Sequence, residues 1–314
     1  MTKNIKKIIT AALVTILSIG VLSGCSNNAQ NSEVKETIMI THRNGETEVP
    51  KNPEKVVVLD YGSLDILDEL GVESIAGVPK NGLPTYLSEY KDDKYTDIGG
   101  IKEFNFETIN EIGPDLIIIE GRQADSYEEL SKIAPTIYLG SDGVDYVKGL
   151  KSNIDTLSMI FDKVSAADEK TKALEERIKT INENVTSNEY DGILTMVADG
   201  SMNVYGKGSR FNIIYNELGF KCTDENIEVS KHGQNVSNEY IAEKNPGYLF
   251  VIDKGVITGS ETSNAKEIIE NELVKTTDTY KNNKIIYLNA EAWYVGGAGI
   301  KSANIMLDDI EKAL

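Results

Sequence analysis

The sequence predicts an α/β fold made of two similar lobes, because one pattern occurs twice at a spacing of 132 residues. Residues 107–122 read ETINEIGPDLIIIEGR, and residues 239–254 read EYIAEKNPGYLFVIDK. Each copy has the pattern of a helix end, a proline-marked turn, a buried strand and a basic residue, Arg122 or Lys254. Between the copies, residues 164–186 form a helical stretch without Gly or Pro. We therefore expect two Rossmann-like lobes joined by a single long α-helix.

The domain boundaries follow from this pattern. They are a signal segment at 1–24, a flexible tether at 25–36, a first lobe at 37–163, the connecting helix at 164–186 and a second lobe at 187–314.

The first lobe alternates strands and helices, which is typical of a mostly parallel sheet. It opens with a hairpin whose tight turn is Asn44-Gly45. A helix after the first buried strand is expected to run through Leu70, with Gly71 as its cap. The apolar runs predicted to be buried strands are 55–60, 74–78, 115–119 and 136–140.

The connecting helix has an apolar face, because Leu174, Ile178, Ile181 and Val185 recur at helical spacing. The pattern from Ser165 to Asp168 predicts a capping box at its start. The elements predicted for the second lobe are a hairpin across Asp199-Gly200, a helix at 211–218, the repeated segment, a strand at 284–289 and a C-terminal helix at 300–313.

The N-terminus has the pattern of an export signal. Three lysines precede an apolar stretch at 8–20 that is too short to remain as a membrane span. The sequence VLSGC at 21–25 matches a lipobox, so Cys25 is predicted to be lipidated and to become the mature N-terminus. An ordinary secretory signal with an incidental cysteine is the alternative. We expect a protein that is anchored by acyl chains to the extracellular face of the cell membrane and does not span it.

Charge and cysteine content limit the possible partners and the source of stability. The formal net charge of −18 at pH 7 argues against a nucleic acid partner. Apart from the lipidation site, Cys222 is the only cysteine, so no intramolecular disulfide is expected. Stability must therefore come from an apolar core, for which about 280 residues suffice.

The duplication places two cations where a ligand is expected. Arg122 and Lys254 each follow a predicted strand, and open α/β sheets bind ligands at the carboxyl ends of their strands. Two cations that face each other across a cleft would hold an anion. The alternative for each is a solvated position in a loop.

The lipobox, the duplicated lobe and the connecting helix together resemble the helical-backbone class (class III) of ABC-transporter substrate-binding proteins. Within that class, the chain is most similar to Gram-positive petrobactin-binding lipoproteins, from about residue 37 to the C-terminus. The stretches that carry this resemblance are KNPEKVVVLDYGSLDILDELG, KYTDIGGIKEFNFETI, GRQADSYEELSKIAPTIYLG, YGKGSR, HGQNVSNEYIAEKNPGYLFVIDKG and AEAWYVGGAG.

The resemblance implies a monomeric binding protein, not an enzyme, which captures a ferric siderophore and delivers it to an ABC permease with its ATPase. Because the siderophore encloses the iron, no cofactor and no metal ligand from the protein are expected. A haem, corrinoid or divalent-metal binding protein on the same scaffold is the alternative. A cell-surface hydrolase is a third reading, but neither Gly-x-Ser-x-Gly nor His-Glu-x-x-His occurs.

The resemblance also implies the cations of the site, which are Arg122, Arg210 and Lys254. Related proteins usually have arginine at the third position, so Lys254 keeps the charge and lacks the planar guanidinium that can donate two parallel hydrogen bonds. Arg210 ends the sequence YGKGSR, whose spacing matches neither nucleotide-binding fingerprint.

Three further residues are candidates for the walls of the cleft. Trp293, the only tryptophan, is expected as an aromatic wall against catechol rings, with core packing as the alternative. Lys80 and Tyr61 each follow a first-lobe strand and are candidates for the rim. The two histidines predict no shared metal site, because His42 lies in the hairpin, remote from the predicted cleft; His232 either lines the cleft or caps a loop.

The repeat supplies one glutamate per lobe, Glu107 and Glu239. The resemblance implies that each meets an arginine of one permease subunit. The alternative is that each only stabilises the first turn of its helix through the macrodipole.

Overall fold

The computed structural model describes residues 36–140, 144–258 and 264–314, and residues 35–314 form one compact unit. The predicted signal segment, the lipidation site Cys25 and all but the last residue of the tether lie outside the described residues.

The first lobe is built on a five-stranded sheet in the order β5-β4-β3-β6-β7, and all its pairs are parallel. Its central strands are short runs of Val, Ile and Leu that are buried on both faces. The strands are β3 (Val56–Val58), β4 (Ile75–Val78), β5 (Thr96–Asp97), β6 (Leu116–Ile119) and β7 (Thr136–Tyr138). The helices and helical turns are α1 (Tyr61–Glu69), η1 (Thr85–Lys91), α2 (Phe106–Ile112), η2 (Gly121–Ser126) and α3 (Tyr127–Leu130). The predicted hairpin forms from β1 (Thr37–His42) and β2 (Gly45–Pro50).

The second lobe has a mixed sheet in the order β11-β9-β8-β12-β13, with the short β10 also paired to β8. Strand β8 forms the predicted antiparallel hairpin with β9 and pairs in parallel with β12. The strands are β8 (Asp191–Ala198), β9 (Ser201–Tyr205), β10 (Lys221–Cys222), β11 (Gln234–Val236), β12 (Tyr248–Asp253) and β13 (Ile285–Leu288). The helices and helical turns are α6 (Ile213–Asn216), α7 (Asn238–Lys244), α8 (Gly255–Thr258), α9 (Ala265–Ile269), η3 (Val274–Thr276), α10 (Asp278–Lys281), η4 (Glu291–Val295) and α11 (Ile300–Ala313).

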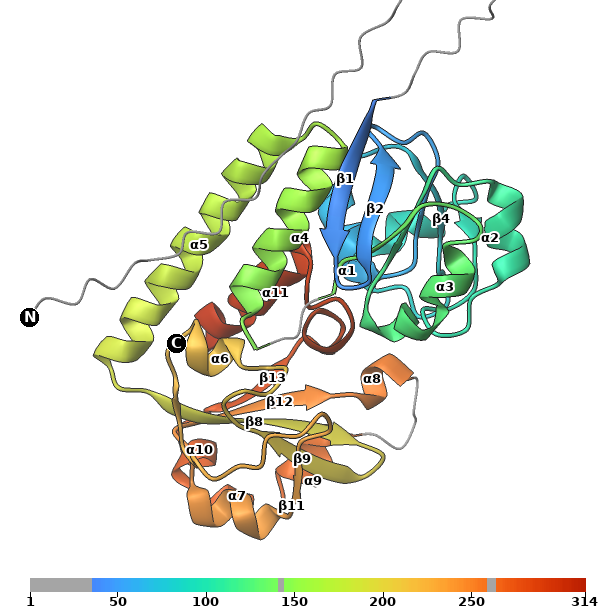
Figure 1. Cartoon of the computed structure of the whole chain (residues 1–314). Coiled ribbons are helices and arrows are strands. Elements are labelled where there is room, and N and C mark those ends of the chain that lie inside the picture. Colours follow the sequence, from blue (N-terminus) through green and yellow to red (C-terminus); the bar gives the residue numbers. More distant parts are fainter. Residues whose placement is uncertain (1–35, 141–143, 259–263) are drawn as a thin grey trace, which may run out of the picture. The chain divides into compact units, whose positions relative to one another are not determined.

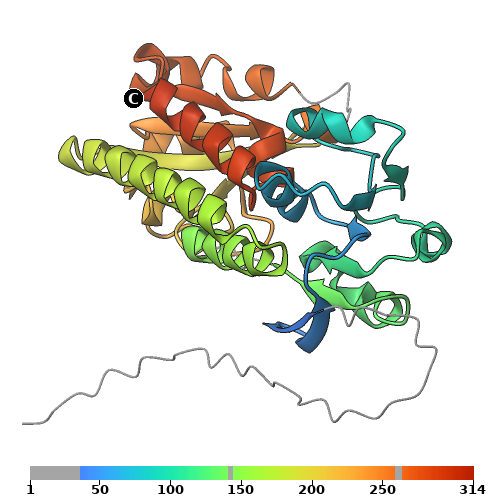
Figure 2. The ribbon, with the colours of Figure 1, turned by 90° about the horizontal axis from the view of Figure 1, so that it is seen from above.

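The connection between the sheets contains two helices, α4 (Tyr146–Ile160) and α5 (Val164–Ser187), which lie side by side (Figures 1 and 2). The chain turns sharply between them at Asp162, whose φ is 52°. The long helix α5 buries Leu174, Ile181 and Val185, as its periodicity predicted. The predicted capping box from Ser165 to Asp168 was wrong, since α5 begins after Lys163 without a side-chain cap.

The C-terminal helix α11 follows the second sheet in sequence but packs against α1 of the first lobe and against α5 (Figure 2). Its first turn is capped by the buried Asp65 of α1, which accepts hydrogen bonds of 2.7 Å from the backbone N–H groups of Lys301 and Ser302. The Lys301 ammonium forms an ion pair of 2.6 Å with Asp68. Helix α11 therefore joins the two lobes at a second place.

Candidate functional site

A cleft of about 860 Å³ lies between the carboxyl edges of the two sheets, and both lobes contribute to its walls. The first lobe supplies Arg43, Asp60, Lys102, Glu120, Arg122, Asp125 and Tyr138. The second lobe supplies Met196, Tyr205, Ser209, Arg210, Val229, Lys231, His232, Trp293 and Tyr294.

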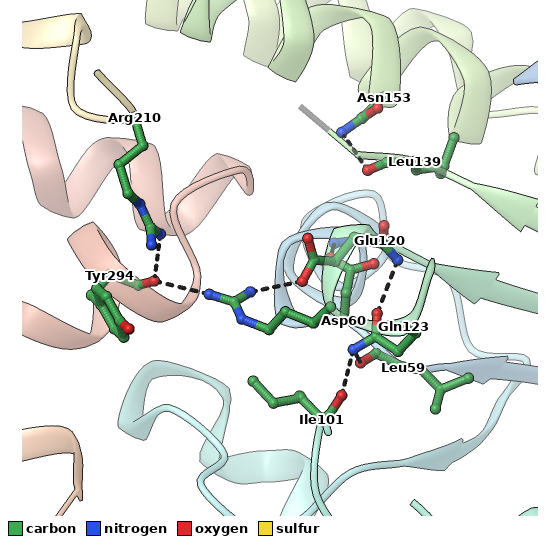
Figure 3. Close-up of polar contacts among 11 residues, drawn as sticks. Leu59, Asp60, Ile101, Glu120, Gln123, Leu139, Asn153, Arg210 and Tyr294 are labelled. Atoms are coloured by element: carbon green, nitrogen blue, oxygen red, sulfur yellow. Dashed lines mark hydrogen bonds and ion pairs between the residues drawn. The ribbon is translucent and has the colours of Figure 1, made fainter. Parts of the chain in front are cut away.

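Arg122 stands on the first-lobe wall, in the helical turn η2 that follows β6. Its Nη1 donates a hydrogen bond of 2.8 Å to Glu120 Oε1, and its Nη2 donates one of 3.1 Å to the backbone carbonyl of Tyr294 (Figure 3). The guanidinium therefore reaches across the cleft to a residue of the second lobe.

Arg210 approaches the same carbonyl from the second lobe, with a hydrogen bond of 3.0 Å from its Nη2 (Figure 3). Its guanidinium carbon lies 4.8 Å from the ring centroid of Tyr294 and 5.1 Å from that of Phe211. Burial among these groups, and then the positive charge of Arg122, lower the pKa of Arg210 although its side chain remains accessible to solvent. Because the guanidinium groups of Arg122 and Arg210 bond to the same carbonyl oxygen, their combined positive charge favours the binding of an anion beside them.

Lys254 approaches the aromatic face of the same tyrosine. Its Nζ lies 5.8 Å from the ring centroid of Tyr294, within the range of a cation–π contact. Lys254 follows β12 directly and is not among the residues that line the cleft. Of the three predicted cations, Arg122 and Arg210 meet at one carbonyl group, and Lys254 stands behind the ring.

Tyr294 is therefore the residue on which the basic side chains converge, and sequence reasoning missed it in favour of its neighbour. Trp293 is 2% exposed, and its indole Nε1 donates a hydrogen bond of 3.0 Å to Asp309 in α11. Trp293 therefore borders the cleft, but its ring is packed mainly in the core. The sequence WYVGG placed both aromatic rings near the cleft and could not distinguish them. The π-helical turn η4 decides which of the two rings meets the arginines.

The two predicted rim residues do not line the cleft. Tyr61 is 2% exposed, and its hydroxyl donates to the carbonyls of Pro79 and Asn81 at 3.2 and 3.0 Å. The Lys80 ammonium donates to the carbonyls of Lys91 and Asp92 at 3.1 and 2.9 Å. Both side chains instead stabilise loops of the first lobe through hydrogen bonds to backbone carbonyls.

The N-terminal hairpin is nearer to the cleft than its sequence indicated. His42 lies at the end of β1, as expected, and its ring packs edge-on against Tyr127 at 5.7 Å. The next residue, Arg43, lines the cleft and donates a hydrogen bond of 3.3 Å to the hydroxyl of Tyr138. The turn of the hairpin thus reaches the cleft through Arg43, whereas His42 itself is not among the lining residues.

His232 is exposed and lines the second-lobe wall, and its backbone carbonyl accepts a hydrogen bond from Tyr205. Among residues 36–140, 144–258 and 264–314, no three His, Cys, Asp or Glu side chains are grouped in a way that suits a metal ion. Within the same part of the chain, no helix has both the length and the apolar character needed to span a membrane.

The two repeated glutamates lie outside the cleft, at equivalent places. Glu107 is exposed in the first turn of α2, and Glu239 is exposed in the first turn of α7. A hydrogen bond from Ser237 and then one from its own backbone N–H lower the pKa of Glu239. Both positions suit docking and helix stabilisation alike.

The fold and the cleft define a bilobal binding protein, and the chain belongs to the periplasmic binding protein family, whose model matches residues 56–292. The predicted class III α/β architecture is thereby confirmed. The chain is 44% identical to the petrobactin-binding protein YclQ of Bacillus subtilis over 311 residues, which cover 96% of each chain. It is 32% identical to the ferric-anguibactin-binding protein FatB of Vibrio anguillarum, again over 96% of each chain.

Solved structures give the same result. The crystal structure of YclQ covers 89% of this chain and 99% of its own, with a TM-score of 0.86. The periplasmic catecholate-siderophore binding protein VctP of Vibrio cholerae is 36% identical and covers 88% of this chain and 100% of its own, with a TM-score of 0.83. Two more distant relatives from Bacillus subtilis, 25% and 28% identical, are named as lipoproteins. These names describe binding proteins, in agreement with the prediction that the chain is not an enzyme.

Proposed function

We propose that this protein captures a ferric siderophore of the catecholate class, with petrobactin-like complexes as the preferred ligands, and delivers it to an ABC importer for iron uptake. The observation that carries the proposal is the meeting of Arg122 and Arg210 at the carbonyl of Tyr294, inside a cleft between two lobes. The 44% identity to a petrobactin-binding protein supports the choice of ligand.

Electrostatics give the physical reason. A ferric complex with catecholate oxygens carries net negative charge, and burial of that charge without cations is costly. Each guanidinium has five donors, and the contacts with Glu120 and Tyr294 use only some of them. Charge-assisted hydrogen bonds from the two arginines would offset the loss of hydration. The aromatic face of Tyr294, between Arg210 and Lys254, offers a surface on which a catechol ring can stack.

Direct titration tests this proposal. Purified protein is titrated with ferric petrobactin, ferric enterobactin and ferrioxamine, with the fluorescence of Trp293 and calorimetry as independent readouts. We expect tight binding of a catecholate complex and no binding of the cationic hydroxamate. Tight binding of haem or a corrinoid, with no signal from any siderophore, would favour the alternative ligands of this scaffold.

Delivery and location belong to the same proposal. We infer a lipid anchor at Cys25 on the extracellular face of the membrane, a monomeric state, and docking of Glu107 and Glu239 on the two permease subunits that work with an ATPase. The lipobox and the two relatives named as lipoproteins support the anchor. The exposed, equivalent positions of the glutamates support the docking role. Cys25→Ala should release the protein into the medium, as measured by blotting of cell and supernatant fractions.

A further inference from the structure

Two carboxylates stand side by side on the first-lobe wall of the cleft. Strands β3 and β6 pair in parallel with Val58 opposite Ile118, and the Leu59 N–H donates to the Ile118 carbonyl at 2.9 Å. Two residues further along this register, Asp60 stands opposite Glu120, and neighbouring strands lie about 4.8 Å apart. Both residues line the cleft, and Figure 3 shows their side chains next to each other.

The two carboxylates differ in their partners. Glu120 Oε1 accepts the hydrogen bond of 2.8 Å from Arg122. Asp60 is 6% exposed, and its Oδ1 caps α1 by accepting from the Ser63 N–H at 2.8 Å. Its Oδ2 is buried and has no hydrogen-bond partner among the described residues. A buried carboxylate oxygen without a donor is costly, so this atom is an acceptor that a bound molecule can satisfy.

The charges indicate which donor fits. Arg122 is shared between Glu120 and the carbonyl of Tyr294, so the positive charge beside the two carboxylates already has partners. Burial, and then the negative charge of Glu120, raise the pKa of Asp60 to about 6, so this carboxylate is ionised at pH 7.5. A cation therefore satisfies this acceptor better than a neutral hydroxyl does, and an entirely anionic ligand would meet repulsion here.

We propose that Asp60, supported by Glu120, forms a subsite for a protonated amine in the chain that links the iron-binding groups of the ligand. This inference rests on the proposed function, because it adds a second recognition element to the same cleft. The arginines bind the anionic iron centre, and the carboxylates select ligands whose linker carries a positive charge. The cleft would then distinguish an amine-containing catecholate from an uncharged analogue of the same size.

A matched pair of synthetic ligands tests the subsite. Ferric bis-catecholates are prepared with a linker of constant length that carries either one secondary amine, placed at successive positions, or only methylene groups. We expect the best amine ligand to bind about 10- to 100-fold more tightly than the methylene ligand at pH 7.5, on the scale of a charged hydrogen bond. Equal affinity for the amine and methylene ligands at every amine position would overturn the inference. Tight binding of the methylene complex would still support the proposed function.

Variants assign the preference to a residue. Asp60→Asn keeps a good N-cap and removes the charge, so it should reduce the amine preference to within about twofold, with the affinity for the methylene ligand raised because the repulsion of the anionic complex is reduced. Asp60→Ser, which also retains a capping oxygen, provides a second test if the amide perturbs the fold. Asp125→Asn, at an exposed carboxylate of the same cleft, is the matched control and should keep the full preference. A preference that survives both Asp60 variants would overturn the subsite, whereas failure of both ligands to bind wild-type protein would overturn the proposed function as well.

Discussion

The two copies of the repeated segment share a backbone and differ in what surrounds their basic residues. Gly113 caps the C-terminus of helix α2 and Asn245 caps that of helix α7, both in the left-handed conformation with φ of 60° and 42°. A proline follows in each copy, and the next strand, β6 or β12, lies within its sheet, paired on both sides.

The copies diverge where the strands end. Strand β6 stops at Ile119, and the turn η2 then places Arg122 in the cleft, where it bonds to Glu120 and Tyr294. Strand β12 continues to Asp253, so Lys254 leaves the sheet at once and stays behind the ring of Tyr294. A duplicated backbone therefore does not imply a duplicated site, because the length of a strand decides where the next side chain points.

The strongest test of this difference is truncation of the basic residues. Arg122→Ala and Arg210→Ala should each weaken binding of the ferric siderophore by about 10- to 100-fold, because each removes charged hydrogen bonds in the cleft. Lys254→Ala should have a smaller effect, and Lys254→Arg should be neutral or increase affinity. Calorimetric titration measures all four, and unchanged melting temperatures exclude loss of the fold. Equal losses at Arg122 and Lys254 would show that the two copies contribute alike.

Glu107 and Glu239, which we propose dock on the permease, test the opposite expectation, that the two copies are equivalent. Glu107→Ala combined with Glu239→Ala should leave affinity in solution unchanged and reduce iron uptake by cells about tenfold, on the scale of a lost charged contact. Each single variant should reduce uptake to a similar, smaller extent. Normal uptake by the double variant would mean that these residues only stabilise their helices.

Buried carboxylates extend the comparison to pH. Burial raises the pKa of Asp60 to about 6 in the first lobe, whereas the backbone N–H of Asn226 and then Lys244 lower that of Asp224 to about 2 in the second. Asp60 thus binds its proton more tightly in the folded state, and its contribution to the free energy of unfolding falls as pH rises from 4 to 6. The contribution of Asp224 is present above pH 4 and is lost as pH falls toward 2.

Denaturant unfolding at pH 4 and pH 7 measures the effect of Asp60, and a third measurement near pH 2 captures that of Asp224. Relative to wild type, Asp60→Asn should be more stable by about 2 kcal/mol at pH 7 than at pH 4. Asp224→Asn should be destabilised at pH 7 and approach wild type as pH falls toward 2. The same change of stability with pH in both variants would contradict the predicted difference between the two carboxylates.

The helix ends give the smallest expected effect. Gly113→Ala should cost about 1 kcal/mol, because its φ of 60° disfavours a Cβ although no atom lies within 4 Å of the site. Asn245→Gly keeps the favourable conformation and loses two side-chain hydrogen bonds, one donated to the Asp278 carboxylate and one accepted from the Asp278 N–H, so it should cost about 0.5 kcal/mol. Thermal unfolding measures both, and a cost-free Gly113→Ala would show that this end of α2 can rearrange.

The sequence by itself determined the elements whose signals are local. Buried strands, the hairpins across Asn44-Gly45 and Asp199-Gly200, and the apolar face of α5 follow from short-range periodicity and turn chemistry, and all were found where expected. The repeat also identified Arg122 as a cleft residue, since the carboxyl edge of a parallel strand is a property of the topology.

Only the tertiary structure decided which side chains meet. The choice of Tyr294 over Trp293 depends on a π-helical turn, and the pairing of Asp60 with Glu120 depends on the register of two strands 60 residues apart in the chain. The approach of Arg43 depends on how the hairpin packs over β7. Each of these is a contact between segments that are distant in the sequence. Packing and the exact lengths of strands and turns determine such contacts, and short-range sequence patterns do not encode them.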